Sequence, residues 1–140
     1  MSWHVKLGLR LWRGVSCLPT TVVAGIAYAV GWLLFPLGGR VTMINLRLCF
    51  PSMSEPERRK LGRRHFMRLA RSVLEMGILW WAPARRVMGL VRVEGREHLD
   101  RIKGQPVIIL TPHFVGLNMG SAKFADVWPG SMAFYSKQKN

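Results

Sequence analysis

The feature that most constrains this chain is a 26-residue stretch without charge, which runs from Gly14 to Gly39. A helix of that length is long enough to cross a bilayer. Its two prolines, Pro19 and Pro36, leave sixteen residues between them, which is short for a spanning helix. Lysine and arginine lie on both sides of the stretch, so the positive-inside rule gives no orientation. A single span and an anchor within one leaflet therefore both stay open.

The composition is both basic and apolar. The net charge is +14, and 49% of the 140 residues are hydrophobic. A soluble nucleic-acid binder is not usually this apolar, whereas a protein on an anionic membrane surface is typically both. The sequence has no zinc-ligand spacing and no RNA-binding aromatic motif. We therefore expect an anionic membrane, and no nucleic acid, as partner. The two cysteines, Cys17 and Cys49, form no CxxC pair and predict two buried thiols in a reducing compartment.

Residues 3–13 predict an amphipathic helix. Lys6, Arg10 and Arg13 follow one another at steps of four and three, which places them on one helical face. The segment also supplies apolar and aromatic side chains from Trp3, Leu7, Leu11 and Trp12. The pattern is typical of a helix that lies in a lipid headgroup layer. A solvated basic face on an ordinary helix is the alternative.

A long amphipathic helix is predicted from about residue 55 to Trp81. Ser54 and Glu57 have the spacing of a capping box at its start, and Pro83 ends it. Its apolar residues recur at steps of three and four: Phe66, Leu69, Val73, Met76 and Trp80. The last residues, "ILWWAP", are apolar on all sides, which predicts that this end is buried in protein or in lipid.

The periodicity changes from residue 91 onward. Residues 91–95 alternate and predict a short strand, and residues 97–105 predict a helical turn and a loop. Residues 106–111, "PVIILT", form a continuous apolar run that is typical of a buried parallel strand. Residues 115–128 predict a helix and residues 131–136 a further strand. This order predicts an α/β fold, with an N-terminal membrane-associated helix and an amphipathic helix before the start of an open sheet.

His113 follows the carboxyl end of the predicted buried strand, and Asn118 comes five positions later. Ligands of open α/β sheets bind at the carboxyl ends of the strands, so His113 is a candidate site residue. A structural histidine that bonds to a backbone carbonyl is the alternative.

Four ordered blocks carry a resemblance to a known family. They read "NLRLCFPSMSEPERRKLGRRHFMRLARSVLE", "VEGREHLD", "GQPVIILTPHFVGLNMG" and "YSKQKN". In order and spacing they resemble the bacterial lipid A biosynthesis acyltransferases, the Kdo-dependent lauroyl or myristoyl transferases of the lysophospholipid acyltransferase superfamily. Under this resemblance, residues 1–40 are an amphipathic membrane-anchor segment and residues 41–140 the amino-terminal part of an acyltransferase domain.

The resemblance implies an enzyme on the cytoplasmic face of the cell inner membrane. It implies transfer of a fatty acyl chain from acyl carrier protein to a hydroxyl of a lipid A precursor, a glycolipid, without a cofactor. The sequence itself has no metal-ligand cluster.

The family's first motif is a histidine followed, after four residues, by an aspartate or glutamate. His113 matches the histidine, and Asn118 stands at the position of the acid. An amide oxygen can orient the imidazole but supplies no negative charge. Three readings follow: a slow enzyme, compensation by another acid such as Asp126, or an inactive relative. Asp126 lies roughly two helical turns beyond Asn118, so we expect it to be a solvated surface residue.

The chain stops inside what resembles the family's second motif. Lys137, Lys139 and Asn140 fall where the resemblance implies binding of the anionic acceptor, although a solvated basic tail would look the same. The sequence resembles an amino-terminal portion of the family's chains. A catalytically inactive or truncated relative, acting only as a basic membrane-binding protein, is therefore the alternative function.

Overall fold

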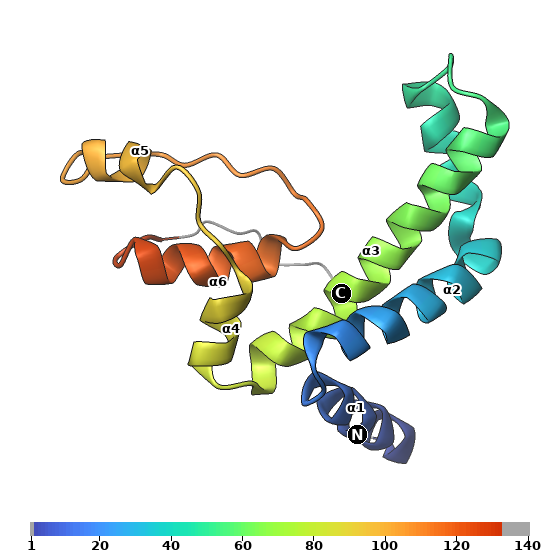
Figure 1. Ribbon diagram of the computed structural model, residues 1–140, viewed down its shortest axis with the longest axis horizontal. Coiled ribbons are helices and arrows are strands. Elements are labelled where there is room, and N and C mark those ends of the chain that lie inside the picture. The colour runs from blue at the N-terminus through green and yellow to red at the C-terminus, as the bar shows by residue number, and fades with distance from the viewer. Residues whose placement is uncertain (1, 133–140) are drawn as a thin grey trace. The chain divides into compact units, whose positions relative to one another are not determined.

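The computed structural model describes residues 2–132 and consists of helices joined by loops (Figure 1). Their order is α1 (Trp3–Ser16), α2 (Thr20–Cys49), α3 (Glu55–Trp81), α4 (Ala84–Leu90), α5 (Arg96–Arg101) and α6 (Leu117–Val127). The chain forms two compact units, Met1–Pro83 and Ala84–Asn140. The first three helices thus make one unit, and His113 belongs to the other.

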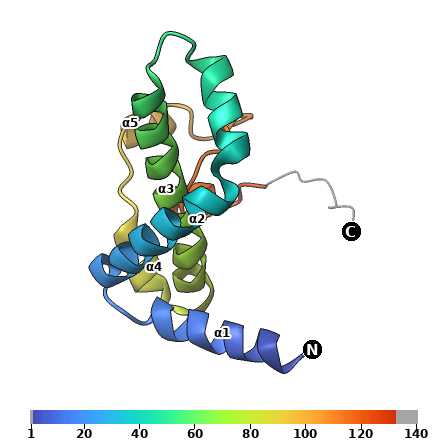
Figure 2. The ribbon, with the colours of Figure 1, turned by 90° about the vertical axis from the view of Figure 1, so that its right-hand side faces the viewer.

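Helices α2 and α3 lie side by side and antiparallel in the first unit (Figures 1 and 2). The face of α2 that meets α3 is a stripe of buried residues at steps of four: Val23, Ala27, Gly31, Phe35 and Gly39. Residues four apart lie on one face of a helix, so this spacing selects the side of α2 that packs. The stripe is mostly small, which allows the two backbones to approach closely.

The closest approach is at Gly31. A Cβ atom built on Gly31 would lie 2.5 Å from the Cα atom of Met67 on α3, so only glycine fits there without a shift of the backbone. One turn further on, the ring of Phe35 fills the space above Gly62 and meets Phe66 edge-on, with 5.5 Å between ring centroids.

Helix α1 packs against the other end of α3. The indole Nε1 of Trp12 donates to the Leu74 carbonyl at 3.4 Å, and its ring lies 5.0 Å from that of Trp80. Gly77 has no side chain, and the Trp12 indole packs into the space that a side chain there would fill. Ile78 is fully buried, whereas Trp80 is 53% exposed. The apolar end of α3 is therefore buried in protein on one side only.

The predicted start and end of α3 are confirmed. Its helix begins at Glu55, after Ser54, and ends at Trp81 before Pro83. The Glu57 carboxylate accepts hydrogen bonds from the Ser54 N–H at 3.0 Å and the Ser54 hydroxyl at 2.6 Å, which completes the capping box. These bonds lower the pKa of Glu57. Helix α2 contacts the same first turn of α3, because the Arg47 guanidinium forms an ion pair with the Glu55 carboxylate at 2.6 Å.

The predicted α/β fold is wrong for the part of the chain that the structure describes. Residues 91–95 and 106–111 form no strand, and residues 2–132 contain helices but no sheet. Ile108 and Leu110 are 98% and 94% exposed, so the apolar run that suggested a buried strand is not buried. A strand exists only when a neighbour accepts and donates its backbone hydrogen bonds, and no other described segment pairs with this run.

The helical predictions for the second unit agree better with the structure. The helical turn expected within residues 97–105 is α5, and the helix expected within residues 115–128 is α6. The last predicted strand, residues 131–136, lies mainly outside the described residues.

Within residues 2–132, α2 is the one helix that is long and apolar enough to cross a membrane, by length and composition alone. Pro36 lies inside it, and the helix changes direction along its length (Figure 1).

Candidate active site

His113 lies in the irregular segment that joins α5 to α6. Figure 1 draws this segment as a loop between the two helices. A tight turn follows it: the Phe114 N–H donates to the Pro112 carbonyl at 2.9 Å, and the Leu117 N–H donates to the Phe114 carbonyl at 3.1 Å. Gly116 then caps α6 with φ at +92°, a left-handed conformation that glycine adopts without strain. The turn leads the chain from His113 directly into the first turn of the helix.

Asn118 is the second residue of α6, and its side chain and that of His113 are both exposed. Within the described part of the chain, no hydrogen bond joins the imidazole to the amide. The structure thus brings the two residues to one loop–helix junction, open to solvent. Their contact stays a prediction, since catalytic hydrogen bonds are often formed only when the substrate is bound.

Asp126 does not serve as the missing acid in this structure. Its carboxylate is about half exposed and pairs with the Lys123 ammonium at 3.2 Å, on the last turns of α6. This is the surface role that its spacing predicts. Lys137, Lys139 and Asn140, the candidate acceptor-binding residues, lie outside the described residues.

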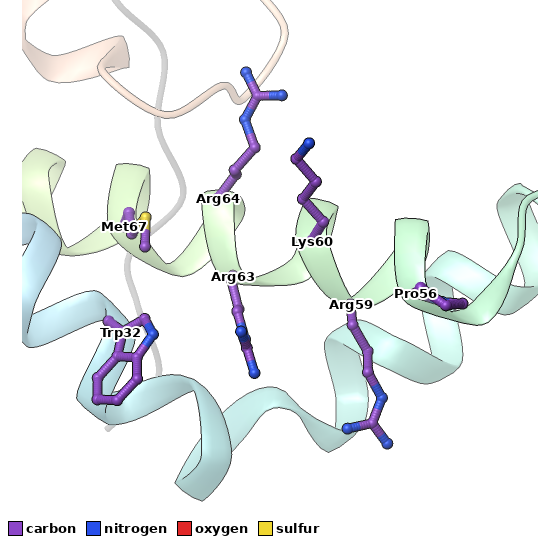
Figure 3. Close-up of a pocket in the computed structure, with 7 residues that line it drawn as sticks. All are labelled: Trp32, Pro56, Arg59, Lys60, Arg63, Arg64 and Met67. Atoms are coloured by element: carbon purple, nitrogen blue, oxygen red, sulfur yellow. The ribbon is translucent and has the colours of Figure 1, made fainter.

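The structure reveals a basic pocket between α2 and α3 that sequence reasoning did not identify (Figure 3). Its volume is about 450 Å³, and its lining consists of Trp32, Pro56, Arg59, Lys60, Arg63, Arg64 and Met67. The side chains of Arg59 and Arg63 extend toward α2, whereas those of Lys60 and Arg64 extend away from it (Figure 3). The guanidinium of Arg63 lies 5.9 Å from the centroid of the Phe35 ring, within the range of a cation–π contact.

One signal for this pocket is present in the sequence. Arg59 and Arg63 are four residues apart and so share a face of α3. The contribution of Trp32 could not be predicted, because it depends on the register in which α2 packs against α3.

The comparisons with known proteins place the chain in one family. The model of the family described as bacterial lipid A biosynthesis acyltransferase matches residues 1–140. The lipid A biosynthesis acyltransferase of Haemophilus influenzae is 31% identical over 124 residues, which cover 85% of this chain and 40% of that protein. The lipid A biosynthesis lauroyltransferase of Escherichia coli is 32% identical over 133 residues, which cover 91% and 44%.

The lipid A biosynthesis palmitoleoyltransferase of Escherichia coli is likewise 32% identical, over 144 residues, which cover 99% of this chain and 46% of that protein. No solved structure matches the chain. The chain belongs to the bacterial lipid A biosynthesis acyltransferases. It spans less than half the length of these curated relatives.

Proposed function

We propose that the protein transfers a fatty acyl chain from acyl carrier protein to a hydroxyl of a lipid A precursor, at the cytoplasmic face of the inner membrane. The observation that carries this proposal is the family match over residues 1–140, which includes His113 at the turn before α6. The relatives are described as lauroyl-, myristoyl- and palmitoleoyltransferases of lipid A biosynthesis.

In this mechanism His113 is the general base. Its neutral imidazole takes the proton of the acceptor hydroxyl as the oxygen attacks the thioester carbonyl. The new C–O bond forms, the C–S bond breaks, and the proton passes from His113 to the leaving thiolate. No covalent acyl-enzyme is required, because the thioester is already activated.

Asn118 has a positioning role in the proposed mechanism. Its amide oxygen accepts the N–H of the second imidazole nitrogen, which fixes the tautomer in which the first nitrogen is free. The backbone N–H of Asn118, next to Gly116, is suited to stabilise the oxyanion, because it has no acceptor among the described residues. The N–H groups of Leu117 and Met119 on either side of it donate to the Phe114 and Gly116 carbonyls. The exposure of His113 supports the proposal, since a large glycolipid must reach its imidazole.

The proposed acceptor is anionic, and the cationic residues Lys137 and Lys139, together with Asn140, are proposed to bind it. We also propose an anionic membrane as a partner, which the net charge of +14 supports.

The test of the proposed function is a product assay on the full-length protein. Carrier protein is loaded in turn with lauroyl, myristoyl and palmitoleoyl chains and incubated with the lipid A precursor. We expect the mass of the precursor to rise by one acyl group less one hydrogen, because the acyl group replaces the hydroxyl proton and the carrier protein leaves as its free thiol. A precursor whose mass stays unchanged with every donor would contradict the proposal.

The alternative function is a membrane-binding relative without catalysis. Asn118 favours this alternative, because an amide replaces the motif's carboxylate. The same assay separates the two functions: a binding protein would associate with vesicles of anionic lipid but leave the precursor unchanged.

A further inference from the structure

Helix α2 carries its large apolar side chains on the outside, whereas a helix of a soluble protein carries them on its buried face. Its small residues, among them Ala27 and Gly31, face α3, and its large apolar residues point outward. Leu37 is 83% exposed and Leu33 60% exposed. Soluble proteins rarely expose a continuous apolar surface of this kind. Small residues between helices and large apolar residues outside are typical of helices surrounded by lipid.

The partner helix α3 places charge beside the same part of α2. Gly31 contacts Met67, Phe35 contacts Gly62, and Tyr28 interacts with Arg71. The segment of α3 from Gly62 to Arg71 therefore lies alongside residues 28–35, within the uncharged stretch. This segment carries four arginines: Arg63, Arg64, Arg68 and Arg71.

Three of these arginines have no carboxylate to neutralise them. Arg71 pairs with Glu75 at 2.7 Å, but no carboxylate in the described part of the chain lies within ion-pair distance of Arg63, Arg64 or Arg68. All three are exposed. If α2 crossed the bilayer with its uncharged residues in the hydrocarbon, the antiparallel α3 would bring these charges into the hydrocarbon as well. Charged side chains are poorly tolerated there.

We propose that the first unit lies in one leaflet of an anionic bilayer, with α2 in the hydrocarbon and α3 at the level of the headgroups. This proposal rests on the membrane attachment in the proposed function and decides between the two modes of attachment that the sequence left open. The leaflet matches both surfaces: its acyl chains cover the apolar outside of α2, and its phosphates neutralise the arginines of α3.

The basic pocket lies at the boundary between these two surfaces (Figure 3). Arg59 and Arg63 extend toward α2, next to Trp32, and a tryptophan is a side chain typical of the headgroup level of a membrane. The pocket thus provides two guanidinium groups for one lipid phosphate at the depth where headgroups begin.

The two native cysteines test the proposal, because they stand at the two ends of α2. Cys17 caps the end of α1 just before α2 begins, Cys49 is the last residue of α2, and both are exposed. Each thiol is studied alone in the full-length protein, by Cys17→Ser or Cys49→Ser, with every other cysteine changed to serine. Sealed membrane vesicles of either orientation are treated with a maleimide that cannot cross the bilayer, and labelling is compared with that in detergent.

We expect both thiols to react from the cytoplasmic side and each to react at least ten-fold less from the other side. Thiols that react from opposite sides would show that α2 crosses the membrane and would overturn the proposal. Thiols that react only after detergent is added would overturn it as well. Reaction of both from the periplasmic side would support attachment to one leaflet, yet contradict the cytoplasmic face of the proposed function.

A second measurement concerns the depth of α3. Nitroxide labels are attached at Arg64→Cys and at Leu33→Cys in a protein without other cysteines, and their relaxation by a water-soluble nickel complex and by oxygen is compared. We expect the label at residue 64 to respond more to nickel and the label at residue 33 to respond more to oxygen. A stronger response to oxygen at both positions would place α3 in the hydrocarbon and overturn the proposal. Neither measurement depends on activity, so an inactive protein that labels as expected would contradict only the proposed function.

Discussion

At the scale of single residues, the proposed catalysis depends on whether the Asn118 amide can assist the His113 imidazole as the motif's carboxylate would. Asn118 stands at the position of the motif's carboxylate, on the first turn of α6 and on the same exposed junction as His113. An amide can fix the tautomer of the histidine, but it does not stabilise the imidazolium that forms when the histidine takes a proton. The proposed enzyme should therefore be slow.

We predict that Asn118→Asp raises kcat for acyl transfer, because a carboxylate stabilises the imidazolium. The upper limit is about 10⁴-fold, the size of the corresponding effect in the serine protease triad. Initial rates with loaded carrier protein measure it. The matched control is Asn118→Gln, which adds no charge and should give no gain. An unchanged rate for Asn118→Asp, in a protein with unchanged helicity, would show that residue 118 does not act on the histidine.

Sequence reasoning could propose His113 and Asn118 because the motif depends only on their spacing. It could not predict whether the two side chains meet, because that depends on their rotamers on the two sides of the turn at Gly116. The same limit applies to the basic pocket. The spacing of Arg59 and Arg63 predicts that they share a face of α3, but Trp32 lies on α2, and its place in the pocket depends on how the two helices pack.

At the scale of helices, the packing of α2 on α3 depends on the absence of a side chain at Gly31. We predict that Gly31→Ala destabilises the first unit by about 1–3 kcal/mol, the usual cost of overpacking a core, because the new methyl group would meet the Met67 backbone at 2.5 Å. Thermal unfolding followed by circular dichroism in detergent measures the effect.

Gly25→Ala is the control for this prediction. Gly25 lies in the same helix, and a Cβ atom built on it has no neighbour within 4 Å. The substitution should be neutral or stabilising, because alanine favours a helix more than glycine does. Equal effects of the two substitutions would contradict the close contact at Gly31.

The first turn of α3 predicts a dependence of stability on pH. The hydrogen bond from Arg47 lowers the pKa of Glu55, and the hydrogen bonds from Ser54 lower the pKa of Glu57. Since both pKa values are lower in the folded state, the two carboxylates stabilise the fold above their unfolded pKa of about 4.3. This contribution is lost as the pH falls through the lower, folded pKa values.

We therefore predict that the melting temperature falls between pH 7 and pH 3, and that Glu55→Gln combined with Glu57→Gln reduces this fall. Glutamine can still complete a capping box but does not titrate. Melting curves of both proteins at the two pH values measure the difference. A fall of the same size in the double variant would show that other groups cause the acid sensitivity.

Helix ends were the most predictable part of the fold, because Ser54, Glu57 and Pro83 act within one or two turns of chain. The predicted strand at residues 106–111 was wrong because an apolar run does not itself determine what pairs with it. Ile108 and Leu110 are nearly fully exposed in the described structure, so their hydrophobicity was a poor guide to burial.

At the scale of the whole molecule, two separate units carry the two requirements of the proposed function. The unit Met1–Pro83 offers an apolar and cationic surface for a membrane, and the unit Ala84–Asn140 contains His113 and Asn118. Four ordered blocks of sequence were enough to predict the family, which the match over residues 1–140 confirms. The proposed mode of membrane attachment rests on the register of α2 on α3, which composition alone cannot supply.

The measurement that tests the central claim most directly is the rate of acyl transfer by His113→Ala in the full-length protein. His98→Ala is the matched control, since His98 is an exposed histidine of α5 in the same unit. We predict that His113→Ala lowers kcat by about 10²–10⁴-fold, the usual contribution of a general base, while His98→Ala keeps the rate of the unchanged protein. If His113→Ala transfers acyl chains as fast as His98→Ala, His113 is not the base and the catalytic centre lies elsewhere.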